Sequence, residues 1–90
     1  MELTEIRKEL DKLDAELVSI LAKRMKFIPE VAEYKKKNNI QRFQPAREKE
    51  ILESKRKLAK EAGLNPDLVE KIFKEIINDA HRIEKEIMGK

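Results

Sequence analysis

An apolar stripe, interrupted by a single arginine, runs through the N-terminal part of the sequence. Its members recur at alternating steps of three and four residues, and they are Leu3, Ile6, Leu10, Leu13, Leu17, Ile20, Arg24, Phe27, Val31 and Tyr34. This spacing is typical of one buried face of an α-helix. Arg24 is the exception, because a guanidinium keeps its charge and is costly to bury without a partner. We therefore expect either an acidic side chain or an external anion to meet Arg24.

The stripe predicts one long first helix, from about Thr4 to about Lys37. Thr4 is the expected N-cap, since its hydroxyl can accept a bond from the first turn. Pro29 lies inside the pattern and lacks a backbone donor, so we expect a kink there rather than an end. Asn38 and Asn39 should terminate this helix.

Two further helices, and no strand, are expected after a short loop. The second helix covers Pro45–Ala62, because proline favours a first helical position and Gly63 can adopt the left-handed conformation that ends a helix. The third opens at Pro66 behind Asn65, a good N-cap, and ends near Gly89. The chain is therefore expected to be all-α, with a three-helix protomer.

The chain's length indicates one domain, residues 1–90, with a limited core of its own. At about 1.5 Å per residue the first helix is roughly 50 Å long, whereas the other two are roughly 27 Å and 34 Å. A hairpin of the two shorter helices cannot cover both apolar sides of the long one. We expect a homodimer in which the long helices pair antiparallel.

Composition excludes several classes of protein. There is no Cys and only one His, so neither thiolate chemistry nor a His-rich metal site is expected. The apolar runs are too short to span a bilayer, and the charged N-terminus does not look like a signal peptide, which favours a cytoplasmic protein without membrane contact. Charges of both signs alternate, with a net charge of +3 and 4% aromatic residues, so nucleic-acid binding is not expected. We interpret His81 as an ordinary, partly exposed helix residue.

Five charged residues occupy positions on or beside the apolar helix faces. They come from all three predicted helices, and they are Arg24, Lys35, Arg47, Glu48 and Glu84. One interpretation is a common polar pocket whose cations bind a small dianion with two carboxylates, because each guanidinium can grip a carboxylate through two hydrogen bonds. The alternative is a structural ion pair of Arg24 with Glu48 or Glu84. Spacing alone does not decide between them.

Arg7 is a further candidate, but it lies about 25 Å before Arg24 along the same helix axis. Both side chains of one helix cannot touch one small ligand over that distance. An antiparallel second chain could bring its own Arg7 to the pocket.

Four segments together resemble the AroQ-class chorismate mutases. They are IRKELDKLDAELVSILAKR, EVAEYKK, PAREKEIL and LVEKIFKEIINDAHRIEKE, which cover nearly the whole chain. The resemblance implies an intertwined all-α homodimer with two active sites, each built from both chains. It also implies the Claisen rearrangement of chorismate to prephenate, a step toward phenylalanine and tyrosine, which needs no metal or cofactor.

The resemblance further implies roles for individual residues. Arg24, Arg47 and the partner subunit's Arg7 would hold the two substrate carboxylates. Lys35 and Glu84 would flank the ether oxygen, with both Lys35 and Glu84 acting in catalysis together with Arg24.

Four positions complete or modify this implied site. Glu48 would accept the ring hydroxyl of the substrate. Some family members carry Gln at the position of Glu84, a hydroxyl at Ala80 and an acidic residue at Gln44. Other interpretations are an isochorismate-pyruvate lyase, which runs a pericyclic step on a similar dianion, and a non-catalytic helical dimerisation module.

Overall fold

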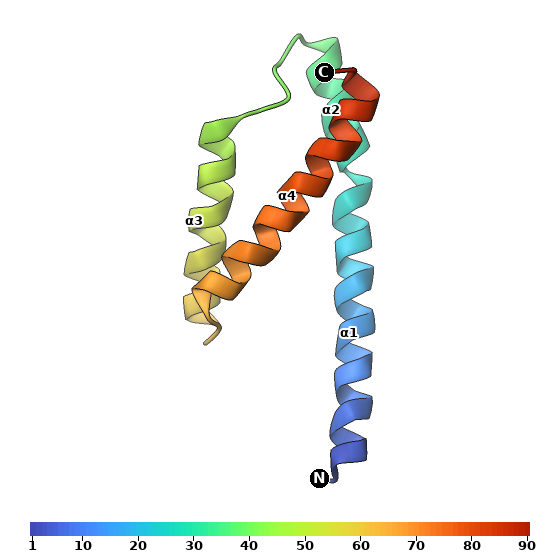
Figure 1. Cartoon of the computed structure of the whole chain (residues 1–90), viewed down its shortest axis with the longest axis vertical. Coiled ribbons are helices and arrows are strands. Elements are labelled where there is room, and N and C mark those ends of the chain that lie inside the picture. The colour runs from blue at the N-terminus through green and yellow to red at the C-terminus, as the bar shows by residue number, and fades with distance from the viewer.

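The computed structural model describes residues 1–90, and its regular structure consists of helices without strands. The helices are α1 (Leu3–Lys26), α2 (Ile28–Lys37), α3 (Pro45–Glu61) and α4 (Pro66–Met88). Figure 1 shows α1 and α2 following one another as a long rod, with α4 crossing from the lower end of α3 to α2. The predicted all-α fold with a long N-terminal helical segment is confirmed.

The long first helix predicted from about Thr4 to about Lys37 is present as α1 and α2, which are separated by a one-residue interruption at Phe27, two residues before Pro29. Pro29 has no N–H to donate to the carbonyl four residues before it. The Phe27 N–H instead donates to the Arg24 carbonyl at 3.2 Å, which is a tighter turn, and the Val31 N–H resumes the normal pattern with the Phe27 carbonyl at 3.0 Å. Proline therefore divides the rod just above Arg24.

The N-cap prediction also needs correction. The first helix begins at Leu3, with Glu2 rather than Thr4 in the N-cap position, and no side chain caps it. The Ile6 N–H donates to the Glu2 carbonyl at 3.0 Å, so the first helical hydrogen bond begins two residues before the predicted N-cap.

The remaining helix ends follow their local sequence signals. Asn39 and Gly63 have positive φ angles of 55° and 74°, and they stop α2 and α3. Gly89, also at 74°, ends α4. The Asn65 side-chain oxygen accepts a hydrogen bond from the Asp67 N–H at 2.9 Å, which confirms the predicted N-cap of α4.

Asn65→Ala is expected to lower the free energy of unfolding by about 1 kcal/mol, because the Asp67 N–H loses its acceptor. Chemical denaturation at a fixed protein concentration measures this change. Asn78→Ala, at an exposed position inside α4, is the matched control and should be neutral or slightly stabilising, since alanine favours helices. Equal effects of the two substitutions would contradict a capping role.

The core lies where α4 packs against α2 and α3. Only five of the 90 residues are buried, and they are Ala32, Ile51, Ala59, Ala80 and Glu84. Three of these are alanines, whose small side chains permit close approach of the helix backbones. A charged residue in so small a core points to this region as the site of function.

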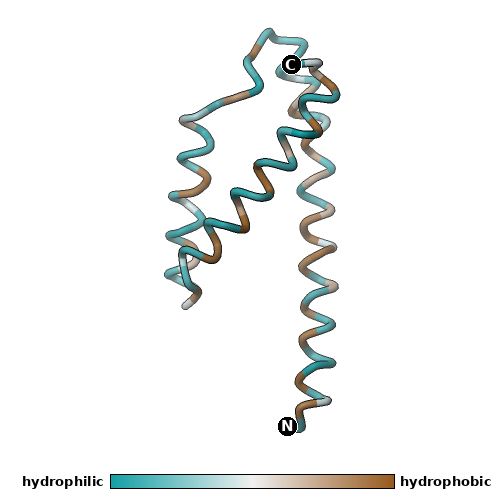
Figure 2. The backbone as a smooth tube through the Cα atoms, viewed as in Figure 1, coloured by the Kyte–Doolittle hydropathy of each residue, from teal (hydrophilic) through white to brown (hydrophobic).

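The first helix buries none of its residues. Its apolar stripe stays in water, and Leu17, for example, is 64% exposed. Figure 2 shows apolar residues recurring along the whole of this rod. Such a continuous exposed stripe marks a surface for association. None of the helices combines the length and the apolar character needed to cross a membrane.

Candidate active site

A cavity of about 210 Å³ lies between the upper part of the rod, α3 and α4. Its charged lining residues are Arg24, Lys35, Arg42, Arg47, Glu48 and Glu84. The apolar part of the wall comes from Ile28, Val31, Ile51, Ile77 and Ala80. Four cationic side chains face two carboxylates, so the lining carries a formal excess of two positive charges. All five charged residues that the sequence analysis grouped together line this one cavity.

Arg24 is the unsatisfied group of the site. Its Nη1 atom is buried and has no hydrogen-bond partner. The guanidinium carbon lies 5.9 Å from the centre of the Phe73 ring, so an aromatic face covers one side of the cation. Neither Glu48 nor Glu84 forms an ion pair with Arg24. The structural ion pair that the sequence left open is therefore absent, and a buried donor remains available.

Lys35 and Glu84 form the central ion pair, with Lys35 Nζ 2.7 Å from Glu84 Oε1. The pair connects α2 to α4, and both side chains are largely buried. Lys35 Nζ also donates to the Arg42 carbonyl oxygen at 2.7 Å. The ammonium is thereby fixed in position by two acceptors, one in a helix and one in the loop between α2 and α3.

His81 and Arg42 belong to the site, and the sequence analysis missed both. His81 Nε2 lies 2.6 Å from Glu48 Oε2, and Arg42 Nη1 lies 2.7 Å from His81 Nδ1. The interpretation of His81 as an ordinary helix residue was incomplete. Its position one turn before Glu84 and one turn after Ile77, on the inward face, was the signal for its place in the site.

Arg47 and Gln44 stand at the rim of the cavity. The Arg47 side chain is 63% exposed, and its Nη1 donates to Glu50 Oε1 at 2.6 Å rather than to a group inside the cavity. The Gln44 side chain donates to the Gln41 carbonyl at 3.0 Å. Ala80 is buried and lines the wall. All three predicted residues therefore line the cavity, but the sequence did not indicate the outward direction of Arg47.

Arg7 does not line the cavity of its own chain. It is exposed on the lower part of α1, whereas Arg24 lies near the upper end of the same helix. This separation agrees with the distance expected from the helical rise.

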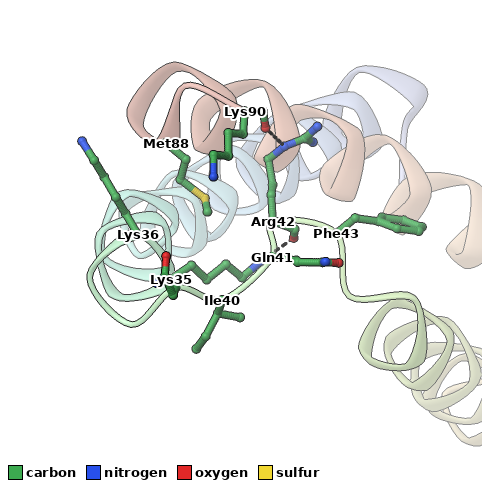
Figure 3. A pocket seen from close by; sticks show the side chains of 9 residues that line it. Lys35, Lys36, Ile40, Gln41, Arg42, Phe43, Met88 and Lys90 are labelled. Carbon is green, nitrogen blue, oxygen red and sulfur yellow. Dashed lines mark hydrogen bonds between the residues drawn. The ribbon is translucent and has the colours of Figure 1, made fainter.

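A second, more open cavity of about 460 Å³ adjoins the first one. Lys35 and Arg42 line both cavities. Figure 3 shows Arg42 reaching from the loop toward the end of the chain, where its Nε donates to the Lys90 carbonyl at 2.5 Å. The same view shows the Arg42 backbone oxygen facing Lys35. Arg42 thus ties the loop to both α2 and the C-terminal end of α4.

The ion pair of Asp79 with Arg82 provides a contrast to the buried groups. The hydrogen bond from Arg82 lowers the pKa of Asp79, and the nearby carboxylate raises that of Arg82. Both groups are solvent-exposed, and neither lines the cavity. This pair is a surface feature of α4 and contributes little to stability.

Residues 6–85 match the family model described as chorismate mutase type II. The chain is 34% identical over 86 residues to the chorismate mutase of Methanocaldococcus jannaschii, a match that covers 96% of this chain and 87% of that protein. It is also 34% identical over 85 residues to the T-protein of Enterobacter agglomerans, covering 94% of this chain and 23% of that protein.

A third relative is the bifunctional chorismate mutase/prephenate dehydratase of Aquifex aeolicus. It is 38% identical over 89 residues, which cover 96% of this chain and 25% of that protein. The chain therefore spans about a quarter of the length of the T-protein and of this bifunctional enzyme.

Proposed function

We propose that this chain, which belongs to the chorismate mutase type II family, converts chorismate to prephenate. The match to that family confirms the resemblance found in the sequence. The substrate is a dianion whose two carboxylates complement the excess of two positive charges in the cavity lining.

The unpaired Nη1 of Arg24 is the observation that carries this proposal. A buried guanidinium N–H without an acceptor is costly to keep, unless a ligand supplies the acceptor. A substrate carboxylate supplies it through charge-assisted hydrogen bonds. Arg24 would then bind one carboxylate, and it would retain its contact with Phe73 behind it.

The rearrangement depends mainly on holding the substrate in one conformation, rather than on reactive side chains. The enolpyruvyl side chain of chorismate must fold over the ring before the new carbon–carbon bond can form and the carbon–oxygen bond can break. Cations that are fixed in position and bind both carboxylates restrict the substrate to that reactive conformer. No nucleophile takes part in a concerted rearrangement, and the proposed roles need neither metal nor cofactor.

Charge stabilisation is the second contribution. The ether oxygen gains negative charge as its bond to the ring breaks, so donors aimed at this atom favour the transition state over the substrate. Lys35 is suited to this role because two acceptors already fix its ammonium. Glu84, within 2.7 Å of that ammonium, would be the second donor when its carboxyl is protonated.

Replacing Glu84 tests its proposed role as a donor. A protonated carboxyl donates a hydrogen bond and a carboxylate does not, whereas the amide of Glu84→Gln always donates. We expect kcat/KM of Glu84→Gln to stay within about tenfold of the original value. Glu84→Leu, which has no donor, should lose at least about a hundredfold. Equal losses in the two variants would rule out the proposed role.

The remaining roles complete the proposed binding set. Arg47 would exchange its exposed bond with Glu50 for a substrate carboxylate, which costs little because exposed ion pairs are weak. Glu48 would accept the ring hydroxyl. Gln44 lines the same cavity and would assist Glu48, and the methyl group of Ala80 would leave room for the substrate without adding a hydrogen bond.

A homodimer of this single domain, residues 1–90, would complete two such sites. The exposed stripe of α1 supports this proposal, because pairing two antiparallel rods would bury it. The same arrangement would carry the partner subunit's Arg7 toward the cavity, where it would hold a carboxylate with Arg24 and Arg47.

Incubation with chorismate tests the function directly. We expect the ultraviolet absorbance of chorismate to decline and prephenate to appear in equal amount. Release of pyruvate from isochorismate in a parallel assay would instead indicate a lyase, and unchanged chorismate at high protein concentration would reject the proposal.

A further inference from the structure

Three side chains from three different segments form a continuous row of hydrogen bonds. Arg42 lies in the loop before α3, His81 is on α4, and Glu48 is in the first turn of α3. The two distances are 2.7 Å from Arg42 Nη1 to His81 Nδ1 and 2.6 Å from His81 Nε2 to Glu48 Oε2. The row lies along the wall of the cavity.

The chemistry of the row assigns each proton. A guanidinium has donors only, so His81 Nδ1 must accept from Arg42. The imidazole is then neutral, and its single N–H is on Nε2, from which it donates to Glu48. Arg42 thus selects the tautomer that can bind the carboxylate.

We propose that His81, held by Arg42, is a positioning residue that orients Glu48 toward the ring hydroxyl of the substrate. This inference rests on the proposed function. His81 occupies Oε2 of the carboxylate and leaves Oε1 without a protein partner, free to accept from the ligand.

The position of Glu48 explains why such restraint is needed. Its side chain is 25% exposed, and it shares the cavity with the unpaired donor of Arg24. A freely rotating carboxylate in this cavity could pair with Arg24 and neutralise the cation that the substrate requires. By holding Oε2, His81 restrains Glu48, which forms no ion pair with Arg24. His81 therefore keeps Glu48 available to the ring hydroxyl of the substrate and Arg24 available to a substrate carboxylate.

A comparison of two substrates separates positioning from general structural support. His81→Ala is expected to raise KM for chorismate roughly tenfold, with kcat within about twofold, because the hydroxyl contact is equal in substrate and transition state. An analogue of chorismate without the ring hydroxyl should react with the variant and the unmodified protein alike, within about twofold. An equal loss for both substrates would overturn the proposal.

His81→Gln is the conservative control. Its amide can donate to Glu48 from nearly the same position as Nε2, so KM for chorismate should return most of the way to the original value. A KM equal to that of His81→Ala would show that donation to Glu48 is not what His81 contributes.

Magnetic resonance provides a readout that does not depend on turnover. His81 is the only histidine of the chain, so its imidazole ¹⁵N signals need no assignment. We expect an unprotonated Nδ1, together with a protonated Nε2 whose hydrogen exchanges slowly with water. Glu48→Leu should make that exchange fast. A protonated Nδ1, or fast exchange in the unmodified protein, would contradict the proposed row of hydrogen bonds. This holds even if the protein converts chorismate normally.

Discussion

Arg24→Met is expected to reduce kcat/KM for chorismate at least about a thousandfold while the protein stays folded. A charge-assisted contact to a carboxylate in a partly buried site is worth several kcal/mol, and each 1.4 kcal/mol corresponds to about tenfold in rate. Methionine occupies a similar volume, keeps contact with Phe73 and has no unsatisfied donor. We therefore expect the melting temperature to stay the same or to rise.

The expected loss of activity without a loss of melting temperature distinguishes the two possible roles of Arg24. A structural arginine that paired with a protein carboxylate would lose stability on substitution, whereas a ligand-binding arginine loses activity. Arg82→Met is the matched control, because it removes the same charge from an exposed ion pair outside the cavity and should keep activity within about twofold. A less stable but active Arg24→Met variant would revive the structural interpretation.

Mixing two inactive variants is expected to restore activity, which is the second large effect. Arg7→Ala and Arg24→Ala should each be nearly inactive alone, since every site in either homodimer lacks one arginine. Half of the dimers in an equal, fully exchanged mixture contain one chain of each kind. In such a dimer one site lacks both arginines and the other has both. The mixture should therefore recover about a quarter of the original activity.

Heterodimer formation must be verified separately, by tagging one variant and recovering the other with it. Each variant subjected alone to the same exchange procedure is the control, and it should stay inactive. No recovery of activity in proven heterodimers would show that Arg7 does not act across the subunit boundary. A protein that sedimented as a monomer yet converted chorismate would contradict a shared site altogether.

The position of α1 explains why we expect recovery. Arg7 is exposed, far along the rod from the cavity, and no residue of α1 is buried by its own chain. An antiparallel pair would bury the stripe and place the N-terminal part of one rod beside the upper part of the other. The same contact would thus stabilise the dimer and complete the site.

The helices were predictable because their signals are local. Apolar spacing depends on 3.6 residues per turn, and caps such as Asn65 and Gly63 act within a few residues of themselves. The ion pair of Lys35 with Glu84 joins two charged residues that the sequence analysis had grouped in one pocket, because each lies on or beside an apolar helix face. Charged residues on an inward face have few alternatives to meeting one another or a ligand.

Other features depended on competition between nearby partners. The break at Phe27 and the start of the first helix at Leu3 differ from the expected positions by small shifts in backbone bonding. The Arg47 side chain turned outward because Glu50 lies one turn away on the same helix. Periodicity specifies a face of a helix, but it does not specify which of two reachable partners a long side chain selects.

By itself the sequence determined the helical class, most helix boundaries, and five of the six charged residues that line one cavity. Only the tertiary structure decided that Arg24 stays unpaired and that Arg42 reaches His81. Arg42 lies in a loop, where no repeat in the sequence indicates the direction of a side chain. Its partner is set by the path of that loop over α4, which is a long-range property of the packed helices.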